Sequence, residues 1–293
     1  MSTWNQAHLL FCEGPHDVAF LNRMLKKELK FEQMALQLSE LPYPISNVLR
    51  QSFQTRAAED FRLDLAKKFF LPDQVLAREG VLVLLFNYGG SNRQKNLPPF
   101  LDNVFPLLEA MAFSGGTQVP LSYVVFADAD AAGTAAARAS ISADLARIDA
   151  QPWLTPDWQT IADLPMAAEQ HTAQGRVGAY IWRRHDADQG TLEDIVLECM
   201  GEQSPFAETL RFVDRRFDWT LAATATPKQV CKLNADRLKA ALCIEGQRKK
   251  PGGSLGVILD QADLLTSERL AASASAQHCV SFLRRWLAVE DIQ

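Results

Sequence analysis

Short apolar runs that alternate with helical patterns are the main structural signal in this chain. Four runs rich in β-branched and aromatic residues are typical of buried strands, at residues 9–12, 81–86, 123–127 and 177–182. Apolar positions at helical spacing follow three of these runs, from about residue 17, from 98 to 111 and from 135 to 148. Strands alternating with helices, without hairpin signals between them, predict a parallel sheet of about four core strands with right-handed crossovers.

The same pattern predicts how the domain is organised. Residues 8–30 and 80–200 are expected to form the core of a single α/β domain spanning residues 1–293. Residues 31–79 have irregularly spaced apolar positions and are expected to be a helical insertion that packs on this core. Residues 151–174 have the prolines and polar residues of a loop. Residues 201–293 are expected to be a helical extension, closed by one amphipathic helix at 267–287.

Composition excludes several classes of protein. The chain of 293 residues has a formal net charge of −5, so any contact with nucleic acid requires a local basic patch. Its five cysteines are scattered and contain no CxxC pair, which argues against a disulfide framework or a cysteine zinc site. The longest apolar run is too short to span a bilayer, and the N-terminus lacks the pattern of a signal peptide. We therefore expect a cytoplasmic protein without a membrane partner.

Acidic residues follow three of the predicted strands. They stand directly after each strand or at the start of the following helix, and they are Glu13, Asp17, Asp128, Asp130, Glu193 and Asp194. Because the carboxyl ends of parallel strands meet at one edge of a sheet, these side chains can converge. Carboxylate oxygens suit Mg²⁺ or Mn²⁺ rather than zinc, and two such ions can clamp the oxygens of a phosphodiester displacement.

A purely structural interpretation explains some of these acids. Asp17 and Asp194 are also first-turn acids, which the dipole of a helix favours. Thr191 has the position of an N-cap, and Asp194 three residues later completes a capping box. Glu13 is harder to explain in this way, because a carboxylate that ends an apolar strand needs a partner.

Basic groups lie in the C-terminal part of the chain. Candidates for binding nucleic acid are Lys232 on a predicted helix and Arg248, Lys249 and Lys250 in a predicted loop. Such groups are often only solvated faces, so each is a candidate and not a motif.

Three segments resemble those of TOPRIM domains, which have a Rossmann-like parallel sheet. The segment FCEGPHD, with Glu13 and Asp17, resembles the first TOPRIM motif, hhhEGxxD. FADAD, with Asp128 and Asp130, resembles the DxD motif. GTLEDIVL, with Glu193, resembles a segment of stand-alone TOPRIM-like proteins related to the nuclease part of OLD-family proteins. The resemblance covers residues 8–30 and 80–200.

This resemblance implies a metal-dependent nuclease that cuts DNA or RNA with one or, more in keeping with the family, two Mg²⁺ or Mn²⁺ ions. It implies that Glu13 is a ligand or general acid and base, and that Asp128 and Asp130 are ligands. Asp17, Glu193 and Asp194 would hold a second ion or support the first. OLD-family nucleases also use a nearby lysine. Lys228 or Lys232 could serve here, and the sequence leaves that role open.

A regulatory partner is also implied. The chain has no Walker motif, GxxxxGK[ST], whereas OLD-family proteins carry an ATPase. In anti-phage systems of the PARIS type, the TOPRIM effector is a separate subunit held by an ATPase, and the resemblance suggests such a partner here. The sequence leaves a homo-oligomer open. Two alternative functions remain: nucleotidyl transfer of the primase or topoisomerase kind, and a non-catalytic regulatory module that holds one ion in an acidic site.

Overall fold

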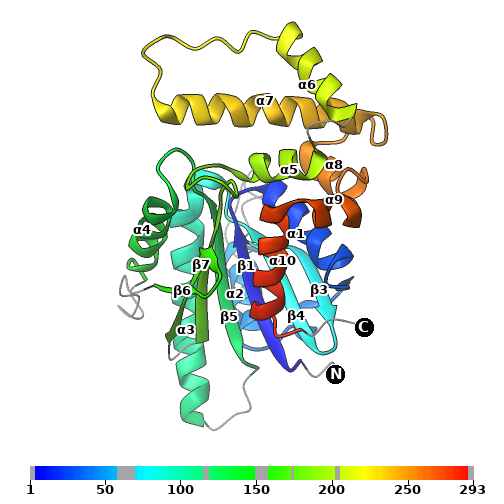
Figure 1. Ribbon diagram of the computed structural model, residues 1–293. Coiled ribbons are helices and arrows are strands. Elements are labelled where there is room, and N and C mark those ends of the chain that lie inside the picture. The colour runs from blue at the N-terminus through cyan, green and yellow to red at the C-terminus, as the bar shows by residue number, and fades with distance from the viewer. Residues whose placement is uncertain are drawn as a thin grey trace.

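The centre of the protein is a mixed sheet of eight strands in the order β2-β3-β4-β1-β5-β8-β7-β6 (Figure 1). The computed structural model describes residues 4–57, 70–114, 119–148, 158–172, 175–201 and 205–289. The strands are β1 (Gln6–Cys12), β2 (Glu32–Gln33), β3 (Pro72–Arg78), β4 (Val81–Asn87), β5 (Leu121–Asp128), β6 (Gln159–Ile161), β7 (Leu164–Thr172) and β8 (Gly175–Trp182). The protein therefore belongs to the α/β class, as the sequence predicts.

The four strands predicted from the apolar runs lie side by side in the middle of this sheet. β1 pairs in parallel with β4 and with β5, and β5 pairs in parallel with β8. Phe11 lies opposite Phe86 on one side and Val125 on the other. Helices cover both faces of these strands, which explains why the strands are continuously apolar instead of alternating.

Both edges of the sheet differ from the prediction, because hairpins extend the parallel core. β3 pairs antiparallel with β4 across a tight turn at Glu79 and Gly80, and β7 pairs antiparallel with β8. Residues 31–79 are therefore not wholly helical, and residues 151–174 are not simply a loop. The signal is weak because β3 is mostly half-buried and begins with Pro72, Asp73 and Gln74, at the end of the strand that does not pair with the two-residue β2. Residues 58–69 and 149–157 lie outside the described residues.

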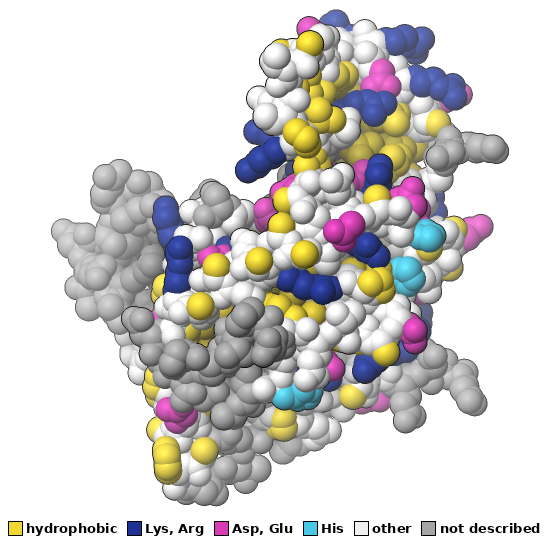
Figure 2. Space-filling model, turned by 60° about the vertical axis from the view of Figure 1, so that its left-hand side comes forward, with side chains coloured by type: hydrophobic (Ala, Val, Ile, Leu, Met, Phe, Trp, Pro, Cys, Tyr) yellow, Lys and Arg dark blue, Asp and Glu magenta, His cyan; other side chains and the backbone are white. Residues whose placement is uncertain are grey.

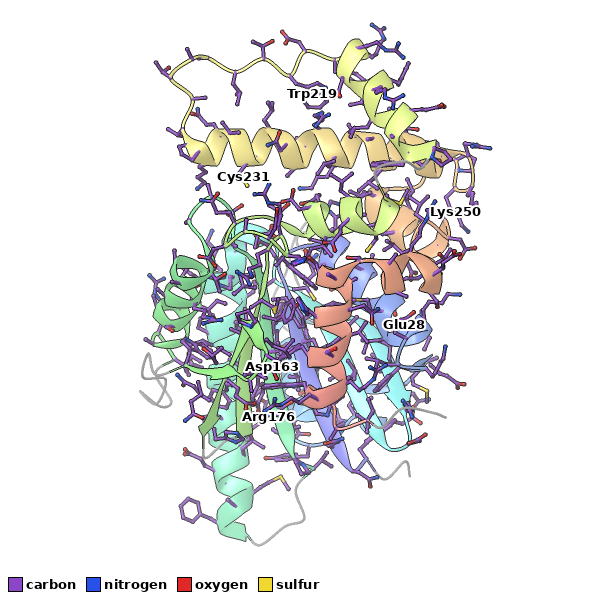
Figure 3. The ribbon with its side chains drawn as sticks, in the orientation of Figure 1. Glu28, Asp163, Arg176, Trp219, Cys231 and Lys250 are labelled. Atoms are coloured by element: carbon purple, nitrogen blue, oxygen red, sulfur yellow. The ribbon has the colours of Figure 1, made fainter. Side chains whose placement is uncertain are left out.

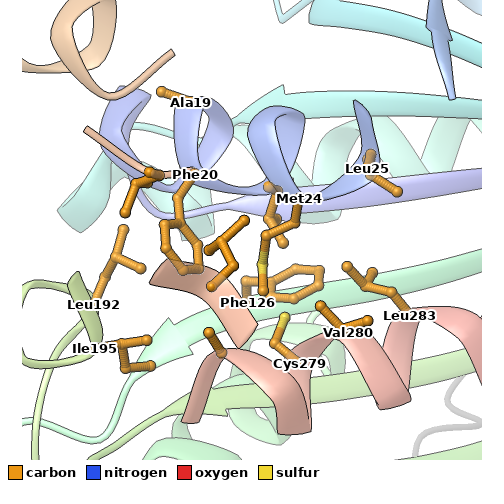
Figure 4. Close-up of a cluster of buried hydrophobic side chains, with 14 of the residues drawn as sticks. Ala19, Phe20, Met24, Leu25, Phe126, Leu192, Ile195, Cys279, Val280 and Leu283 are labelled. Carbon is orange, nitrogen blue, oxygen red and sulfur yellow. The ribbon is translucent and has the colours of Figure 1, made fainter. Parts of the chain in front are cut away.

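Helices form a layer on each face of the sheet. One face carries α1 (Pro15–Lys27) and α10 (Ala274–Trp286), whose apolar side chains interdigitate with Phe126 of β5 (Figure 4). The other face carries α2 (Ile45–Ala57), α3 (Arg93–Ser114) and α4 (Thr134–Leu145), around a second apolar cluster. Two short 3₁₀ helices, Leu38–Glu40 and Gly90–Asn92, lie in the connections.

The described residues beyond Gly201 are helical, as predicted. After α5 (Leu192–Met200) come α6 (Pro205–Arg216), α7 (Pro227–Gln247), α8 (Leu255–Gln261) and α9 (Ser267–Ala272). The expected single helix at 267–287 is two helices, because Ser273 leaves helical geometry and its Oγ accepts a hydrogen bond from Ala276 N at 3.1 Å. α6 and α7 form an arm that extends across the carboxyl edge of the sheet (Figure 1). Among the described helices, none is long and apolar enough to cross a membrane.

A buried histidine joins the sheet to the last helix. His8 on β1 has its Nδ1 2.6 Å from Ser122 Oγ on β5, and Trp286 Nε1 donates to the same oxygen at 2.9 Å. Burial, followed by the charge of Arg176, lowers the pKa of His8 from 6.5 to about 3. His8 is therefore neutral in the folded protein at all pH values near neutrality.

We predict that His8 makes the fold sensitive to mild acid. Below pH 6.5 the unfolded chain protonates His8 and the folded protein does not, so the free energy of unfolding falls by about 2 kcal/mol between pH 7 and pH 5. In His8→Asn, whose amide can still reach Ser122, this part of the pH dependence should disappear. Urea unfolding at both pH values measures it. An unchanged pH dependence in the variant would contradict the assignment.

Candidate active site

Parallel pairing brings the ends of β1, β5 and β8 together at one edge of the sheet. Glu13 directly follows β1, Asp128 is the last residue of β5, and α5 begins after β8 with Leu192. The loop after β4 closes onto the same edge, since Gly90 N donates to the Glu13 carbonyl oxygen at 2.6 Å. Gly89 and Gly90 have positive φ values of 77° and 56°, which permits this return of the chain.

Two of the predicted acids are held by hydrogen bonds from neighbouring elements. Asp17 Oδ2 accepts from Gly14 N at 3.0 Å, and its Oδ1 accepts from Trp182 Nε1 at 2.8 Å. Asp128 Oδ1 accepts from Leu192 N at 2.9 Å, at the N-terminus of α5. Both carboxylates are thus fixed in direction, and Asp17 has each of its oxygens engaged.

The charges of these acids act on one another. Burial, followed by the charges of Glu13 and Glu193, raises the pKa of Asp17 to about 7. Burial, followed by the charges of Asp17, Glu13 and Glu193, raises the pKa of Asp128 well above its usual value. The pKa of Glu13 is also raised, chiefly by burial, although a backbone hydrogen bond at Asp128 opposes the shift. We call Glu13, Asp17, Asp128 and Glu193 the acid cluster.

The other two predicted acids have different places. Asp130 is exposed, has a φ of 50°, and is held through its backbone, which exchanges hydrogen bonds of 2.9 and 3.1 Å with Gly190. Its charge nevertheless contributes to the raised pKa of Glu13, so it lies at the rim of the cluster. Asp194 Oδ2 accepts from Thr191 N at 2.8 Å, which confirms the predicted capping box. Asp194 is therefore engaged as a helix cap.

The lysine that faces the acid cluster is Lys239 on α7. Its Nζ lies 3.3 Å from Glu193 Oε1, and the Glu193 side chain is only 7% exposed. The charge of Asp128 also acts on its pKa. Lys228 and Lys232, the lysines expected from the sequence, are exposed. They stand eleven and seven positions before Lys239, on the same side of the helix, so periodicity alone does not distinguish the three.

Three further residues lie near the acid cluster, and no pattern in the sequence predicts that they belong to the site. Cys231 lies on the side of α7 that faces the strand ends (Figure 3). Burial, followed by the charges of Asp130, Asp194, Asp128 and Glu193, raises the pKa of its thiol to about 11. His16 is half-buried beside Glu193 and Lys239, and burial lowers its pKa. Arg93, which pairs with Asp144 at 2.6 Å, acts on Glu13 with its charge.

The basic loop predicted to bind nucleic acid lies away from the acids. Arg248 ends α7, and Lys249 and Lys250 follow it at the opposite end of the helix from Cys231 (Figure 3). Seventeen residues of helix separate Cys231 from Arg248, which corresponds to about 26 Å. Lys232, the remaining member of the predicted set, directly follows Cys231 on α7 and is exposed.

The donors of the cluster fit a hard divalent cation by their chemistry. They are carboxylates, which hard cations prefer as ligands. One oxygen of Asp128 already accepts a hydrogen bond from Leu192 N, and one oxygen of Glu193 pairs with Lys239. Within the described residues, no three Asp, Glu, His or Cys side chains are close enough together to form a metal site. The expected ion sites at Glu13, Asp128 and Asp130 therefore stay predictions, and Asp17 is suited to support and not to direct ligation.

Comparisons with known proteins identify neither a family nor an activity for this chain. No family model matches the chain, and no curated protein matches it. The crystal structure of a hypothetical protein from Pyrococcus horikoshii OT3 is similar over 97% of this chain and 98% of that chain, with 12% identity and a TM-score of 0.46. This similarity is too distant to carry an argument. The molecule is defined by its fold and site as an α/β protein with buried acids at the carboxyl edge of its parallel strands.

We predict that removing one charge from the acid cluster stabilises the protein. The raised pKa of Glu13 means that its ionised form is disfavoured in the folded state, so the carboxylate destabilises the fold at high pH and not below its unfolded pKa. Without divalent ions, Glu13→Gln should raise the free energy of unfolding at pH 8 by about 0.5–2 kcal/mol. The gain should disappear near pH 4. Chemical denaturation in EDTA at both pH values tests this, and a loss of stability at pH 8 would contradict it.

Proposed function

We propose that the protein is a Mg²⁺-dependent nuclease that cleaves phosphodiester bonds in DNA or RNA, with a TOPRIM-like core. The observation that carries the proposal is the acid cluster at the shared edge of parallel strands, where burial and the neighbouring carboxylates raise the pKa of Asp17 and of Asp128. Like charges buried this closely favour a bound cation. Lys239 supplies one positive charge, to Glu193, and the remaining negative charge is suited to a divalent ion.

The side chains divide the work of hydrolysis between them. Glu13 and Asp128, with Asp130 at the rim, would hold the ion, which when bound would polarise the phosphoryl oxygen and lower the pKa of water. Alternatively, with the ion held by Asp128 and Asp130 alone, Glu13 would be free to take a proton from the attacking water or to give one to the leaving oxygen, since burial raises its pKa when no cation is bound to it. Asp17 joins the end of β8 to the start of α1, because its carboxylate accepts hydrogen bonds from Trp182 and from Gly14. Lys239 and Lys232, both on α7, would attract the phosphate backbone.

The second part of the proposal is that a regulatory partner controls this activity. A nuclease without control harms its own cell, and the sequence has no Walker motif and no recognisable module for reading base sequence. We therefore propose control by a separate ATPase subunit in anti-phage defence, with the insertion at 31–79 or the C-terminal helices as the docking surface. Phe212 and Phe217, about half exposed on the α6–α7 arm, favour the second surface. Hydrophobic and basic side chains stand together on this projection (Figure 2).

A non-catalytic module remains the second candidate. It would use the same acid cluster to hold a single ion, and the described residues contain no group of three ligand side chains that distinguishes this module from the nuclease. Such a module would bind an ion without cutting nucleic acid. Nucleotidyl transfer has no specific observation in its favour.

Cleavage tests the proposed reaction directly. With Mg²⁺ the purified protein, alone or with its partner, should cut nucleic acid, and EDTA should abolish the activity. Glu13→Gln and Asp128→Asn should each lower the rate about 10²-fold or more, because each removes a charge or a proton acceptor. Asp186→Asn is the matched control, since this acid is 79% exposed and pairs with Arg184. Full activity in Glu13→Gln would refute the assignment.

Cys231 offers a test of ion binding that does not depend on cleavage. Because the acids raise the pKa of its thiol, Mg²⁺ bound among them should lower that pKa. Alkylation by iodoacetamide at pH 8 should then speed up roughly three- to tenfold on addition of Mg²⁺. Cys243 is the internal control, because burial alone raises its pKa. Equal rates at Cys231 with Mg²⁺ and with EDTA would count against an ion in the cluster.

A further inference from the structure

The N-terminus of α4 is closed by a side chain from a distant loop. Its N-cap residue is Gly133, which provides no side-chain cap, and Asp188 takes that place by accepting a hydrogen bond from Thr134 N at 3.3 Å. A Cβ on Gly133 would lie 2.6 Å from Asp188 Oδ2, so only glycine lets the carboxylate come this close. A helix N-terminus with exposed amides attracts anions.

Two arginines surround the same carboxylate. Arg183, at the end of β8, lies 3.5 Å from Asp188 through its Nη1, and its side chain is 17% exposed. Arg138 stands one turn into α4 and donates to the Pro165 carbonyl. Burial lowers the pKa of Arg138, and the charge of Asp188 opposes the shift while that of Arg183 adds to it. Two partly buried guanidinium groups therefore act on a single aspartate that is 62% exposed.

Three donors around Asp188 have no partner among the residues that the structure describes. They are Thr134 Oγ1, Arg138 Nε and Arg183 Nε, and all three atoms are buried. Thr134 itself is only 6% exposed. Buried donors in folded proteins are nearly always paired, so three in one place indicate a missing acceptor.

Helix capping by Asp188 does not account for this arrangement. Its contacts, at 3.3 and 3.5 Å, are long, and a carboxylate has two oxygens for a site with more donors than that. A phosphoryl group has more oxygens, carries more charge, and pairs well with arginine. The site also adjoins the acid cluster, because Asp188 and Gly190 lie in the loop whose Gly190 is bridged to Asp130. Acidic and basic side chains lie next to each other on this side of the molecule, below the arm (Figure 2).

We propose that the N-terminus of α4, with Thr134, Arg138 and Arg183, is a binding site for a phosphoryl group, and that the Asp188 carboxylate occupies this site when no phosphoryl group is bound. The incoming phosphoryl group displaces the Asp188 carboxylate and accepts hydrogen bonds from the Thr134 amide and hydroxyl and from the two arginines. That the group belongs to a nucleic acid rests on the proposed nuclease function. The site would then hold one phosphate of the strand while a neighbouring phosphodiester lies at the acid cluster.

Calorimetric titration with inorganic phosphate in EDTA tests the site apart from any cleavage. Asp188→Asn should bind phosphate roughly tenfold more tightly than the unmodified protein, the equivalent of about 1.4 kcal/mol, because the competing charge is gone. Arg183→Gln and Thr134→Val should bind more weakly, while Thr134→Ser should retain binding. Asp186→Asn is the matched control, since it removes an acid from the same loop and should leave the affinity unchanged.

The result that overturns the site is equal phosphate affinity in the unmodified protein and in Asp188→Asn. Asp188 is mostly exposed, so this variant should fold, and thermal unfolding of each variant checks the others. A second titration compares short oligonucleotides with a 5′-phosphate and with a 5′-hydroxyl. Tighter binding of either oligonucleotide by Asp188→Asn supports a nucleic-acid phosphate. If Asp188→Asn binds inorganic phosphate more tightly but neither oligonucleotide, the site binds an anion and its assignment to nucleic acid is refuted. Both outcomes can be measured whether or not the protein cuts nucleic acid.

Discussion

The mutual repulsion of carboxylates at the carboxyl edge of the sheet is the constraint on which the account of this protein depends. Parallel pairing of β1, β5 and β8 brings Glu13, Asp17, Asp128 and Glu193 together, where burial and the charges of neighbouring carboxylates raise the pKa of Glu13, Asp17 and Asp128. The surrounding structure is arranged to tolerate them: Trp182 and the Gly14 and Leu192 amides donate to them, and Lys239 pairs with Glu193. Carboxylates with pKa values raised by burial and by one another cluster at functional sites, so this arrangement points to function.

The centre of the fold was predictable because burial on both faces leaves a strong signal in the sequence. The continuous apolar runs of β4, β1, β5 and β8 stand out wherever they occur. The edges were not predictable in the same way, since β3 and β7 mix polar and apolar residues and derive their pairing from the strand beside them. Their hairpins therefore appear in the sequence as a helical insertion and a loop.

The candidate site was likewise predictable only in part. Acids at strand ends were predictable, because parallel topology decides which edge they share. The capping box could be identified from Thr191 and Asp194, which stand three positions apart. Lys239 could not be distinguished from Lys228 and Lys232, because all three lie on one side of α7 and only tertiary packing decides which of them meets the acids. Thr134, Arg138 and Arg183 come from separate elements, and no local pattern connects them.

The most direct test of the central claim is where a divalent ion binds. Crystals grown or soaked with Mn²⁺ would give anomalous difference density at every bound ion. A peak is expected within ligand distance of carboxylate oxygens of Glu13 and Asp128, and none when both are replaced by amides. Mn²⁺ bound only elsewhere, or no peak with these carboxylates intact and ionised, would contradict the assignment of the acid cluster as a metal-dependent active site.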